Sequence, residues 1–214
     1  MDNKTIEKVL KVLEEKYGEW KAPIVTEIAN KTGDPFRVLI STVLSSRTKD
    51  AVTRKASERL FKRASTPQEI MRLSPEEIEQ LIYPVGFFRT KARRLPELVR
   101  ILIDEYEGKV PDKLDELLKL PGVGRKTANL VVTIGFGKPG ICVDTHVHRI
   151  SNRFGYVRTK NPTETEFALR EKLPERWWIS YNDFLVTLGQ NICFPRKPHC
   201  GDCPLSKLCE KVNI

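Results

Sequence analysis

Four of the five cysteines lie close together near the C-terminal end, in the pattern C-x6-C-x2-C-x5-C formed by Cys193, Cys200, Cys203 and Cys209. Clustered thiols in a chain without an export signal indicate metal binding rather than disulfides. Zinc is one candidate, because Cys200-x2-Cys203 is half of a common zinc site and His199 offers a further ligand. Four thiolates in one short loop also suit a [4Fe–4S] cluster, and the spacing alone leaves both open. We expect the remaining cysteine, Cys142, to be a buried small apolar residue.

A glycine turn, LPGVGRKTA at residues 120–128, joins two expected helices. Gly122 and Gly124 allow unusual backbone angles, and their amides would point outward at the start of the second helix. The helix dipole favours an anion there, such as a phosphate of a nucleic-acid backbone, and Arg125 adds positive charge. The ordinary alternative is a glycine-rich helix–helix turn. No strand precedes the turn, so it is neither a P-loop nor a dinucleotide fingerprint, and we expect no nucleotide cofactor.

Two further residues could take part in covalent chemistry. Lys126 follows Arg125 at a helix start, and both features disfavour the charged ammonium, so we expect a lowered pKa and a nucleophilic amine. The ordinary alternative is a solvated surface lysine. Asp144, in VDTHVHR at 143–149, is expected to cap a helix and could also face a cleft. His146 and His148 are two residues apart, which places them on different helix faces and disfavours a two-histidine metal site.

The elements that must position these residues all have helical patterns. Apolar residues recur at spacings of three and four in the first helix, and no segment shows sustained period-two alternation, so we predict an all-α fold. The start signals are Asp34-Pro35 and three capping-box sequences, at 66–69, 74–77 and 163–166. The predicted helices include one through Ile6, Val9, Leu10 and Leu13, one ending at Gly108, a short one starting at Pro111-Asp112, and three near 143–155, 161–173 and 177–190.

The overall composition is basic, with 37 Lys and Arg against 28 Asp and Glu in 214 residues, a formal charge of +9. This balance favours a polyanionic partner, although many basic proteins bind no nucleic acid. No apolar segment is long enough to span a membrane, and the first twenty residues lack the apolar block of a signal peptide. We therefore expect a cytoplasmic protein, associated with the nucleoid if the partner is DNA.

At the level of motifs, the sequence resembles endonuclease III, of the helix-hairpin-helix DNA glycosylase superfamily. The resemblance rests on LPGVGRKTAN at 120–129, VDTHVHR at 143–149 and the Cys193–Cys209 loop, with further similarity at 44–53 and 86–95. It spans nearly the whole chain and favours iron–sulfur over zinc. The fold it implies has two helical domains flanking a DNA-binding cleft. One is a helical barrel with the hairpin, at 28–138, and the other is a cluster domain built from 1–27 and 139–214.

The same resemblance implies a monomeric base-excision repair enzyme acting on duplex DNA that contains a damaged base. It would remove damaged pyrimidines and then cut the strand as an apurinic/apyrimidinic lyase. Lys126 would be the nucleophile that forms a Schiff base, and Asp144 the essential carboxylate. The turn of Gly122, Val123, Gly124 and Arg125 would bind the DNA backbone, and the four cysteines would hold a [4Fe–4S] cluster.

Four other residues receive roles from the resemblance. Arg47 stands where many relatives carry glutamine, at the position that fills the space left by a flipped nucleotide. Phe87, with Phe88, is a candidate apolar wedge, with core packing as the alternative. Arg196 and Lys197, in the first part of the cysteine loop, would meet phosphates. We expect Trp177 and Trp178 to pack in the protein.

Two other functions compete with this interpretation. A monofunctional mismatch glycosylase for thymine or adenine shares the implied fold and cluster, but such relatives lack the lysine found here as Lys126, and the adenine enzymes carry an additional C-terminal domain. A non-enzymatic helix-hairpin-helix DNA-binding module would not depend on Asp144.

Overall fold

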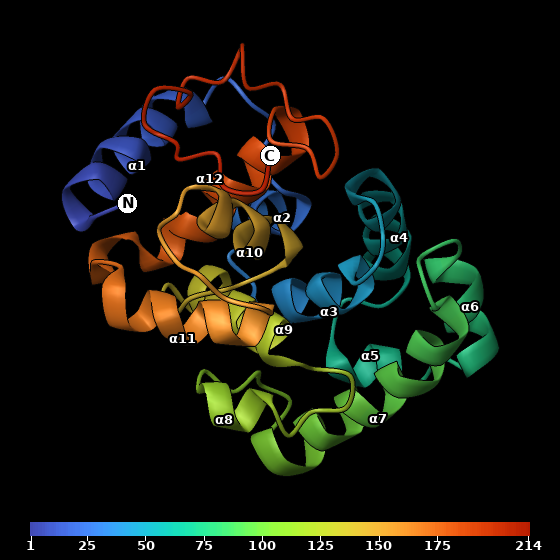
Figure 1. Ribbon diagram of the computed structural model, residues 1–214. Coiled ribbons are helices and arrows are strands. Elements are labelled where there is room, and N and C mark those ends of the chain that lie inside the picture. Colours follow the sequence, from blue (N-terminus) through green and yellow to red (C-terminus); the bar gives the residue numbers. More distant parts are fainter. The chain divides into compact units, whose positions relative to one another are not determined.

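The computed structural model describes residues 1–214, and all of its regular elements are helices, which confirms the predicted all-α class (Figure 1). Contacts divide the chain into two units. We call Ile24–Lys138 the continuous unit, and Met1–Pro23 together with Pro139–Ile214 the discontinuous unit. The first domain boundary predicted from the sequence follows residue 27, which lies within helix α2 (Ile24–Thr32), and all of α2 belongs to the continuous unit.

The continuous unit is organised around α3, Pro35–Ser45, whose apolar residues face all directions. Such a helix is stable only when its neighbours cover it on every side. Helices α2, α4, α7 and α9 and the short π-helix η1 pack against it. The elements of this unit are α2 (Ile24–Thr32), α3, α4 (Asp50–Arg63), α5 (Pro67–Met71), α6 (Pro75–Ile82), α7 (Phe88–Tyr106), α8 (Leu114–Leu117), α9 (Arg125–Leu130) and η1 (Val131–Gly135).

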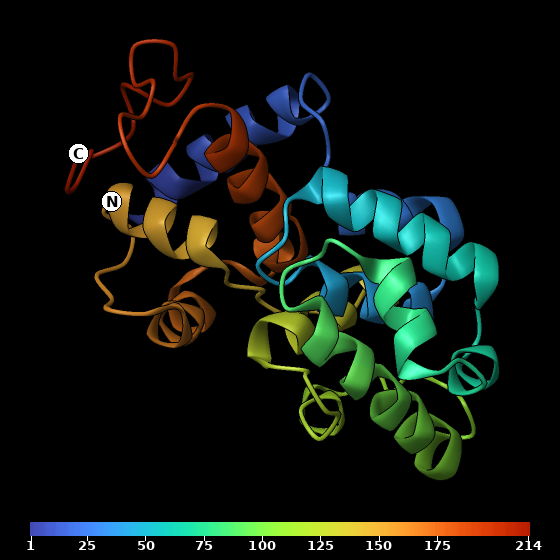
Figure 2. The ribbon, with the colours of Figure 1, turned by 90° about the vertical axis from the view of Figure 1, so that its right-hand side faces the viewer.

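Local capping signals set several helix starts in this unit. Asp34 accepts a hydrogen bond from the Phe36 amide, with Pro35 at the first helical position, as predicted. The capping boxes of Thr66 and Ser74 are both formed, which confirms the predicted starts of α5 and α6. These two short helices pack against the long α7, as two views of the ribbon show (Figures 1 and 2).

The short helix predicted to start at Pro111-Asp112 begins instead at Leu114. That prediction was wrong because the Asp112 carboxylate pairs with the ammonium of Lys138 rather than capping the helix. The helix expected to end at Gly108 is α7, which ends at Tyr106; Glu107 and Gly108 follow, both with positive φ angles, of 55° and 75°.

The discontinuous unit consists of α1 (Asn3–Tyr17), α10 (Thr145–Arg153), α11 (Pro162–Lys172), the 3-10 turn η2 (Glu175–Trp177), α12 (Trp178–Asn191) and the C-terminal cysteine loop. Helix α1 packs against α12, although 160 residues separate the start of α12 from the end of α1 (Figures 1 and 2). Its four predicted apolar positions, Ile6, Val9, Leu10 and Leu13, are fully buried. The predicted amphipathic first helix is therefore confirmed.

The capping box predicted at 163–166 does not form. Asn161 is the N-cap of α11 instead, its side chain accepting from the Glu164 amide, and Pro162 occupies the first turn. An Asn-Pro pair two residues upstream is a stronger start signal than the threonine, because proline is already set at the helical φ angle. The Thr165 side chain is buried in the unit rather than exposed at a helix end.

None of the helices has both the length and the apolar character that crossing a lipid bilayer requires.

Candidate functional site

The turn between α8 and α9 has two glycines that do different things. Gly122 has a φ angle of +80°, in the left-handed region where an L side chain is strained. Gly124 has an ordinary φ of −97°, and a Cβ added there would have no neighbour within 4 Å. Neither backbone conformation nor packing therefore requires glycine at position 124. A glycine here leaves the space in front of the α9 N-terminus open.

Lys126 lies in the first turn of α9, directly beyond this open end. Gly124 is the N-cap of α9, and because glycine has no side chain, no side-chain cap bonds to the first amides of α9. Lys126 is exposed, whereas the next residues, Thr127 and Ala128, are buried. The turn thus presents backbone amides and a lysine amine at the surface of the continuous unit, where the helix dipole favours an anion.

Asp144 belongs to the discontinuous unit and is the N-cap of α10. Its Oδ1 accepts hydrogen bonds from the amides of His146 (2.8 Å) and Val147 (2.9 Å). The predicted cap is therefore confirmed. The second carboxylate oxygen, Oδ2, takes no part in these cap hydrogen bonds.

The two histidines of α10 have separate hydrogen-bond partners. His146 Nδ1 lies 3.1 Å from Nη2 of Arg149, and the same nitrogen of Arg149 donates to the Cys193 carbonyl at 2.8 Å. His148 Nδ1 lies 2.7 Å from the hydroxyl of Thr165. A Cβ at Gly189 of α12 would lie 2.3 Å from the His146 ring, so this glycine permits the close packing of α12 on α10.

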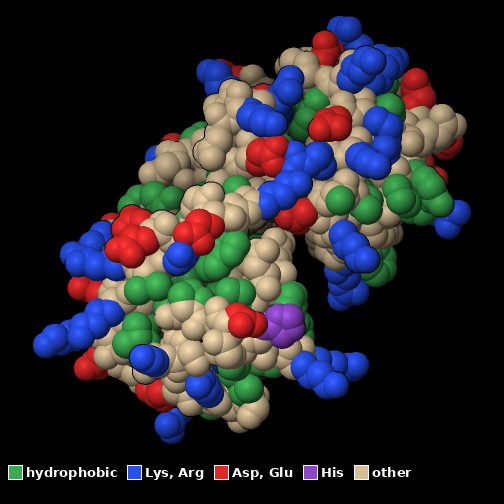
Figure 3. Space-filling view, turned by 90° about the horizontal axis from the view of Figure 1, so that it is seen from above, with side chains coloured by type: hydrophobic (Ala, Val, Ile, Leu, Met, Phe, Trp, Pro, Cys, Tyr) green, Lys and Arg blue, Asp and Glu red, His purple; other side chains and the backbone are tan.

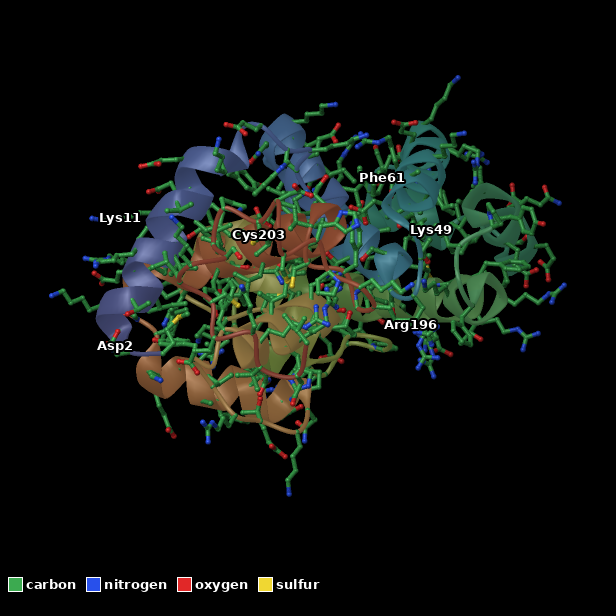
Figure 4. The ribbon with its side chains drawn as sticks, turned by 45° about the horizontal axis from the view of Figure 1, so that its top comes forward. Asp2, Lys11, Lys49, Phe61, Arg196 and Cys203 are labelled. Carbon is green, nitrogen blue, oxygen red and sulfur yellow. The ribbon has the colours of Figure 1, made fainter.

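Cys193, Cys200, Cys203 and Cys209 line a single cavity together with apolar side chains that include Phe154, Leu188 and Ile192. Four thiols around one cavity are the donor set that a [4Fe–4S] cluster takes, so the residues present fit such a cluster. Cys203 lies in the C-terminal loop, where Figure 4 labels it.

Burial raises the pKa of the Cys203 and Cys209 thiols. Their thiolate forms are therefore costly unless a metal centre or a cation accompanies them. The remaining cysteine, Cys142, is 1% exposed, as expected for a small apolar residue of the core.

Arg153 is a residue that the sequence analysis missed. This buried side chain donates to the Cys193 sulfur (3.3 Å) and to the carbonyls of Phe194 (2.7 Å) and Pro195 (2.8 Å). Its own carbonyl accepts from the Val212 amide at 3.0 Å, so it connects both ends of the cysteine loop. The signal was present: Val147, Ile150 and Arg153 recur every three residues, which places a charge on the apolar face of α10.

Arg47 and Phe87 lie together on the continuous unit. The Arg47 guanidinium carbon is 5.3 Å from the centre of the Phe87 ring, at cation–π distance. Phe87 is 60% exposed, so it is not a core aromatic. The neighbouring Phe88 contacts the Tyr83 ring edge to face at 5.3 Å, as a packing residue does.

Arg196 and Lys197 are exposed in the cysteine loop, and Figure 4 labels Arg196. Trp177 is buried and Trp178 donates its indole N–H to the Leu173 carbonyl at 2.9 Å, which confirms that both pack in the protein. Basic side chains are spread over the face in Figure 3, with acidic groups among them.

Comparison with known families matches these features. Residues 40–175 match the HhH-GPD superfamily of base excision DNA repair proteins, and residues 193–209 match the iron-sulfur binding domain of endonuclease III. Endonuclease III of Thermotoga maritima is 55% identical over 181 residues, which are 85% of each chain. The chain belongs to the endonuclease III family. The resemblance stated from the motifs is thereby confirmed.

Other relatives extend this similarity. Endonuclease III of Bacillus subtilis is 39% identical over 83% of this chain and 82% of its own. Endonuclease III-like protein 1 of Mus musculus is 44% identical over 81% of this chain, which corresponds to 59% of that longer protein. A solved structure of a non-covalent endonuclease III–DNA complex has a TM-score of 0.88 and 38% identity, covering 99% of this chain and 96% of that one. A thermostable thymine-DNA glycosylase has a TM-score of 0.83 and 28% identity, covering 98% and 97%.

Membership of the endonuclease III family makes the chain a base-excision DNA glycosylase with apurinic/apyrimidinic lyase activity. Its cofactor is a [4Fe–4S] cluster, so the choice between iron–sulfur and zinc that the cysteine spacing left open is settled.

Proposed function

We propose that this endonuclease III removes damaged pyrimidines from duplex DNA and that Lys126 is its nucleophile. The observation that supports this most directly is an exposed lysine in the first turn of α9, beyond a turn that leaves space at Gly124. The damaged nucleotide first rotates out of the duplex, at a cost of a few kcal/mol in stacking and pairing. The amine then attacks C1′ and expels the base, which leaves a Schiff base between the lysine and the sugar. β-Elimination breaks the strand 3′ to the lesion.

The role we propose for Asp144 is that of the essential carboxylate. Its Oδ1 is occupied by the α10 cap, which fixes the side chain, and its Oδ2 remains for chemistry. That oxygen either accepts a proton from the attacking amine or stabilises positive charge on the sugar.

We propose that the turn of Gly122, Val123, Gly124 and Arg125 binds the DNA backbone independently of the base sequence. Gly124 lets a phosphate approach the amides at the α9 N-terminus, and Val123 is buried and anchors the turn. Arg196 and Lys197 supply further phosphate contacts from the cysteine loop. Arg47 and Phe87 are proposed to enter the space that the flipped nucleotide leaves.

The ligands we propose for the [4Fe–4S] cluster are Cys193, Cys200, Cys203 and Cys209, which share one cavity. When bound, the cluster would stabilise the loop that carries Arg196 and Lys197. The discontinuous unit is then the cluster domain, and the continuous unit is the helical barrel with the hairpin. We further propose that the enzyme acts as a monomer and works in the cytoplasm, where it would associate with the nucleoid.

Borohydride trapping tests the nucleophile. Reduction of the Schiff base links wild-type enzyme covalently to damaged duplex, and Lys126→Gln should abolish this product while duplex binding stays within about threefold of wild type. Lys109→Gln, which changes an exposed lysine of the same unit, is the matched control and should trap normally. Undiminished trapping in Lys126→Gln would show that another amine is the nucleophile.

A second candidate substrate is thymine mismatched with guanine, which the similarity to the thermostable thymine-DNA glycosylase favours. Turnover on duplexes with thymine glycol, 5-hydroxycytosine, uracil, G·T, A·8-oxoguanine or an abasic site separates the two. Damaged pyrimidines should be removed with strand cleavage. Removal of thymine from G·T in preference to the damaged pyrimidines would favour the mismatch as the substrate.

A further inference from the structure

Lys91 is a buried lysine that the proposed chemistry does not use. Its residue is 8% exposed, and it lies on α7 among apolar positions of the continuous unit. Its Nζ donates to the carbonyls of Leu44 and Ser46, each at 2.8 Å. These carbonyls belong to the end of α3, where helix carbonyls lack intrahelical donors. Burial lowers the pKa of Lys91 to about 8, so this ammonium is held at an energetic cost that a leucine or methionine would not have.

The Ser46 carbonyl connects Lys91 to a second turn. It also accepts from the Thr48 hydroxyl at 3.1 Å, and that hydroxyl oxygen accepts from the Gly86 amide at 2.9 Å. A Cβ at Gly86 would lie 2.4 Å from the Arg47 carbonyl oxygen, so only glycine lets the two turns approach this closely. The peptide units on both sides of Arg47 are thereby fixed.

The two turns carry an exposed pair of side chains. Arg47 has a φ angle of +53° and Phe87 one of +56°, both in the left-handed region that non-glycine residues rarely adopt. The guanidinium lies over the exposed Phe87 ring. Backbone strain of this kind persists only where surrounding contacts enforce it, and it concentrates at functional sites. Here the enforcing contacts are those of Lys91, Thr48 and Gly86.

We propose that Lys91 is a positioning residue for opposite-base recognition: by fixing the turn around Arg47, it presents the Arg47–Phe87 pair as one rigid unit to the base across from the lesion. This rests on the proposed entry of that pair into the space left by the flipped nucleotide. A side chain in that space faces the Watson–Crick edge of the opposite base, where guanine has the acceptor O6 and adenine has a donor amino group at the same position. A guanidinium has five donors and no acceptor, so it matches O6 of guanine and not the amino group of adenine. The enzyme should therefore prefer guanine over adenine opposite the lesion, and Lys91 should be needed for this preference.

The test compares abasic-site duplexes that have guanine or adenine opposite the site, because the lyase reaction on them does not depend on which damaged base the enzyme removes. Wild-type enzyme should show a kcat/KM ratio for guanine over adenine of about ten, the lower part of the range for one good arginine–guanine contact. Lys91→Met should bring this ratio to within about twofold of one while it still forms the borohydride-trapped product, and Lys91→Arg should restore most of it. Lys55→Met, on the exposed face of α4, is the matched control and should keep the wild-type ratio.

A double-variant comparison separates positioning from folding. Arg47→Ala should lose the ratio on its own, and adding Lys91→Met should change it no further, because both act through one side chain. Thr48→Val breaks the link to Gly86 but leaves Lys91 in place, so it should also lose the ratio and provides the test if Lys91→Met does not fold.

Three results would overturn the proposal: a wild-type ratio near one, a Lys91→Met enzyme slowed equally on both duplexes, or a Thr48→Val enzyme with the wild-type ratio. Failure to remove any damaged pyrimidine, with the ratio on abasic sites intact, would instead overturn the proposed substrate and leave the role of Lys91 standing.

Discussion

At the scale of single residues, Asp144 combines a structural role with the chemical one proposed for it. The carboxylate caps α10 through one oxygen, and asparagine caps a helix almost as well as aspartate. Substitution can therefore separate the two roles.

Asp144→Asn should keep the thermal stability of the wild type while lowering the single-turnover rate of base removal by about 100-fold or more, because the amide cannot accept a proton. Asp144→Ala should lose the same activity and about 1 kcal/mol of stability, since the cap is also lost. Melting temperatures and single-turnover assays on thymine glycol duplex measure the two effects. An active Asp144→Asn enzyme would restrict this residue to capping.

Lys91 should also make stability depend on pH. Its pKa is about 8 in the folded chain against an ordinary value of 10.5, so between these values the unfolded chain binds more protons and stability rises with pH. Relative to Lys91→Met, the wild type should gain about 2 kcal/mol between pH 7 and pH 9.5, which is several degrees in Tm. Melting curves at both pH values check this. Parallel shifts in the two proteins would mean that Lys91 does not titrate in this range.

At the scale of elements, the turn before α9 contains one glycine that the backbone conformation requires and one that leaves open space for a ligand. Gly122 is required by its φ angle, whereas Gly124 sits at an N-cap with ordinary angles and open space. A polar residue that caps helices well should therefore be tolerated at position 124 without loss of stability.

Gly124→Asp should leave stability unchanged or raise it by up to about 1 kcal/mol, because a carboxylate at an N-cap suits the helix dipole. The same charge would repel a phosphate, so affinity for undamaged duplex should fall by about tenfold or more. Gly124→Asn has nearly the same shape without the charge and should bind much closer to wild type. Fluorescence anisotropy measures binding, and equal affinities for both variants would argue against a phosphate at this turn.

How far the sequence predicts these elements depends on how local their signals are. The starts at Thr66 and Ser74 are set within four residues, and both were predicted correctly. The start at Thr163 was wrong because Asn161 and Pro162 compete two residues away. Lys91 could not be assigned from its neighbours, since its acceptor carbonyls lie 47 and 45 residues back along the chain. The four clustered cysteines could be picked out from their spacing in the sequence. The role of Arg153, which hydrogen-bonds to the cysteine loop, could be recognised only in the folded structure.

At the scale of the whole molecule, the formal charge of +9 contributes to DNA affinity mainly through the individual Lys and Arg side chains that contact phosphates. Arg196 and Lys11 are both exposed residues of the discontinuous unit, and Figure 4 labels both. Only Arg196 belongs to a segment that we propose binds DNA.

The salt dependence of DNA binding measures how many phosphate contacts the protein makes. The slope of log Kobs against log salt changes by about 0.9 for each phosphate contact on duplex DNA. Arg196→Ala should make the slope shallower by about that amount, and Lys11→Ala should leave it unchanged. Titrations between about 50 and 200 mM salt measure both. Identical slopes for Arg196→Ala and wild type would remove this residue from the DNA-binding surface.

The packing of α1 against α12 has a consequence for biosynthesis. The ribosome makes α1 before most of the residues that cover it, because the core that buries Ile6, Val9, Leu10 and Leu13 contains residues as far along as Leu205. The continuous unit can complete its contacts while the nascent chain is still growing, because all of its residues precede Pro139. The apolar residues of α1 stay without this core until α12 has been made, and Cys209 follows α12 in the sequence. The four cysteines can therefore bind a cluster only after α12 has been made, and until then the apolar residues of α1 lack the core that covers them.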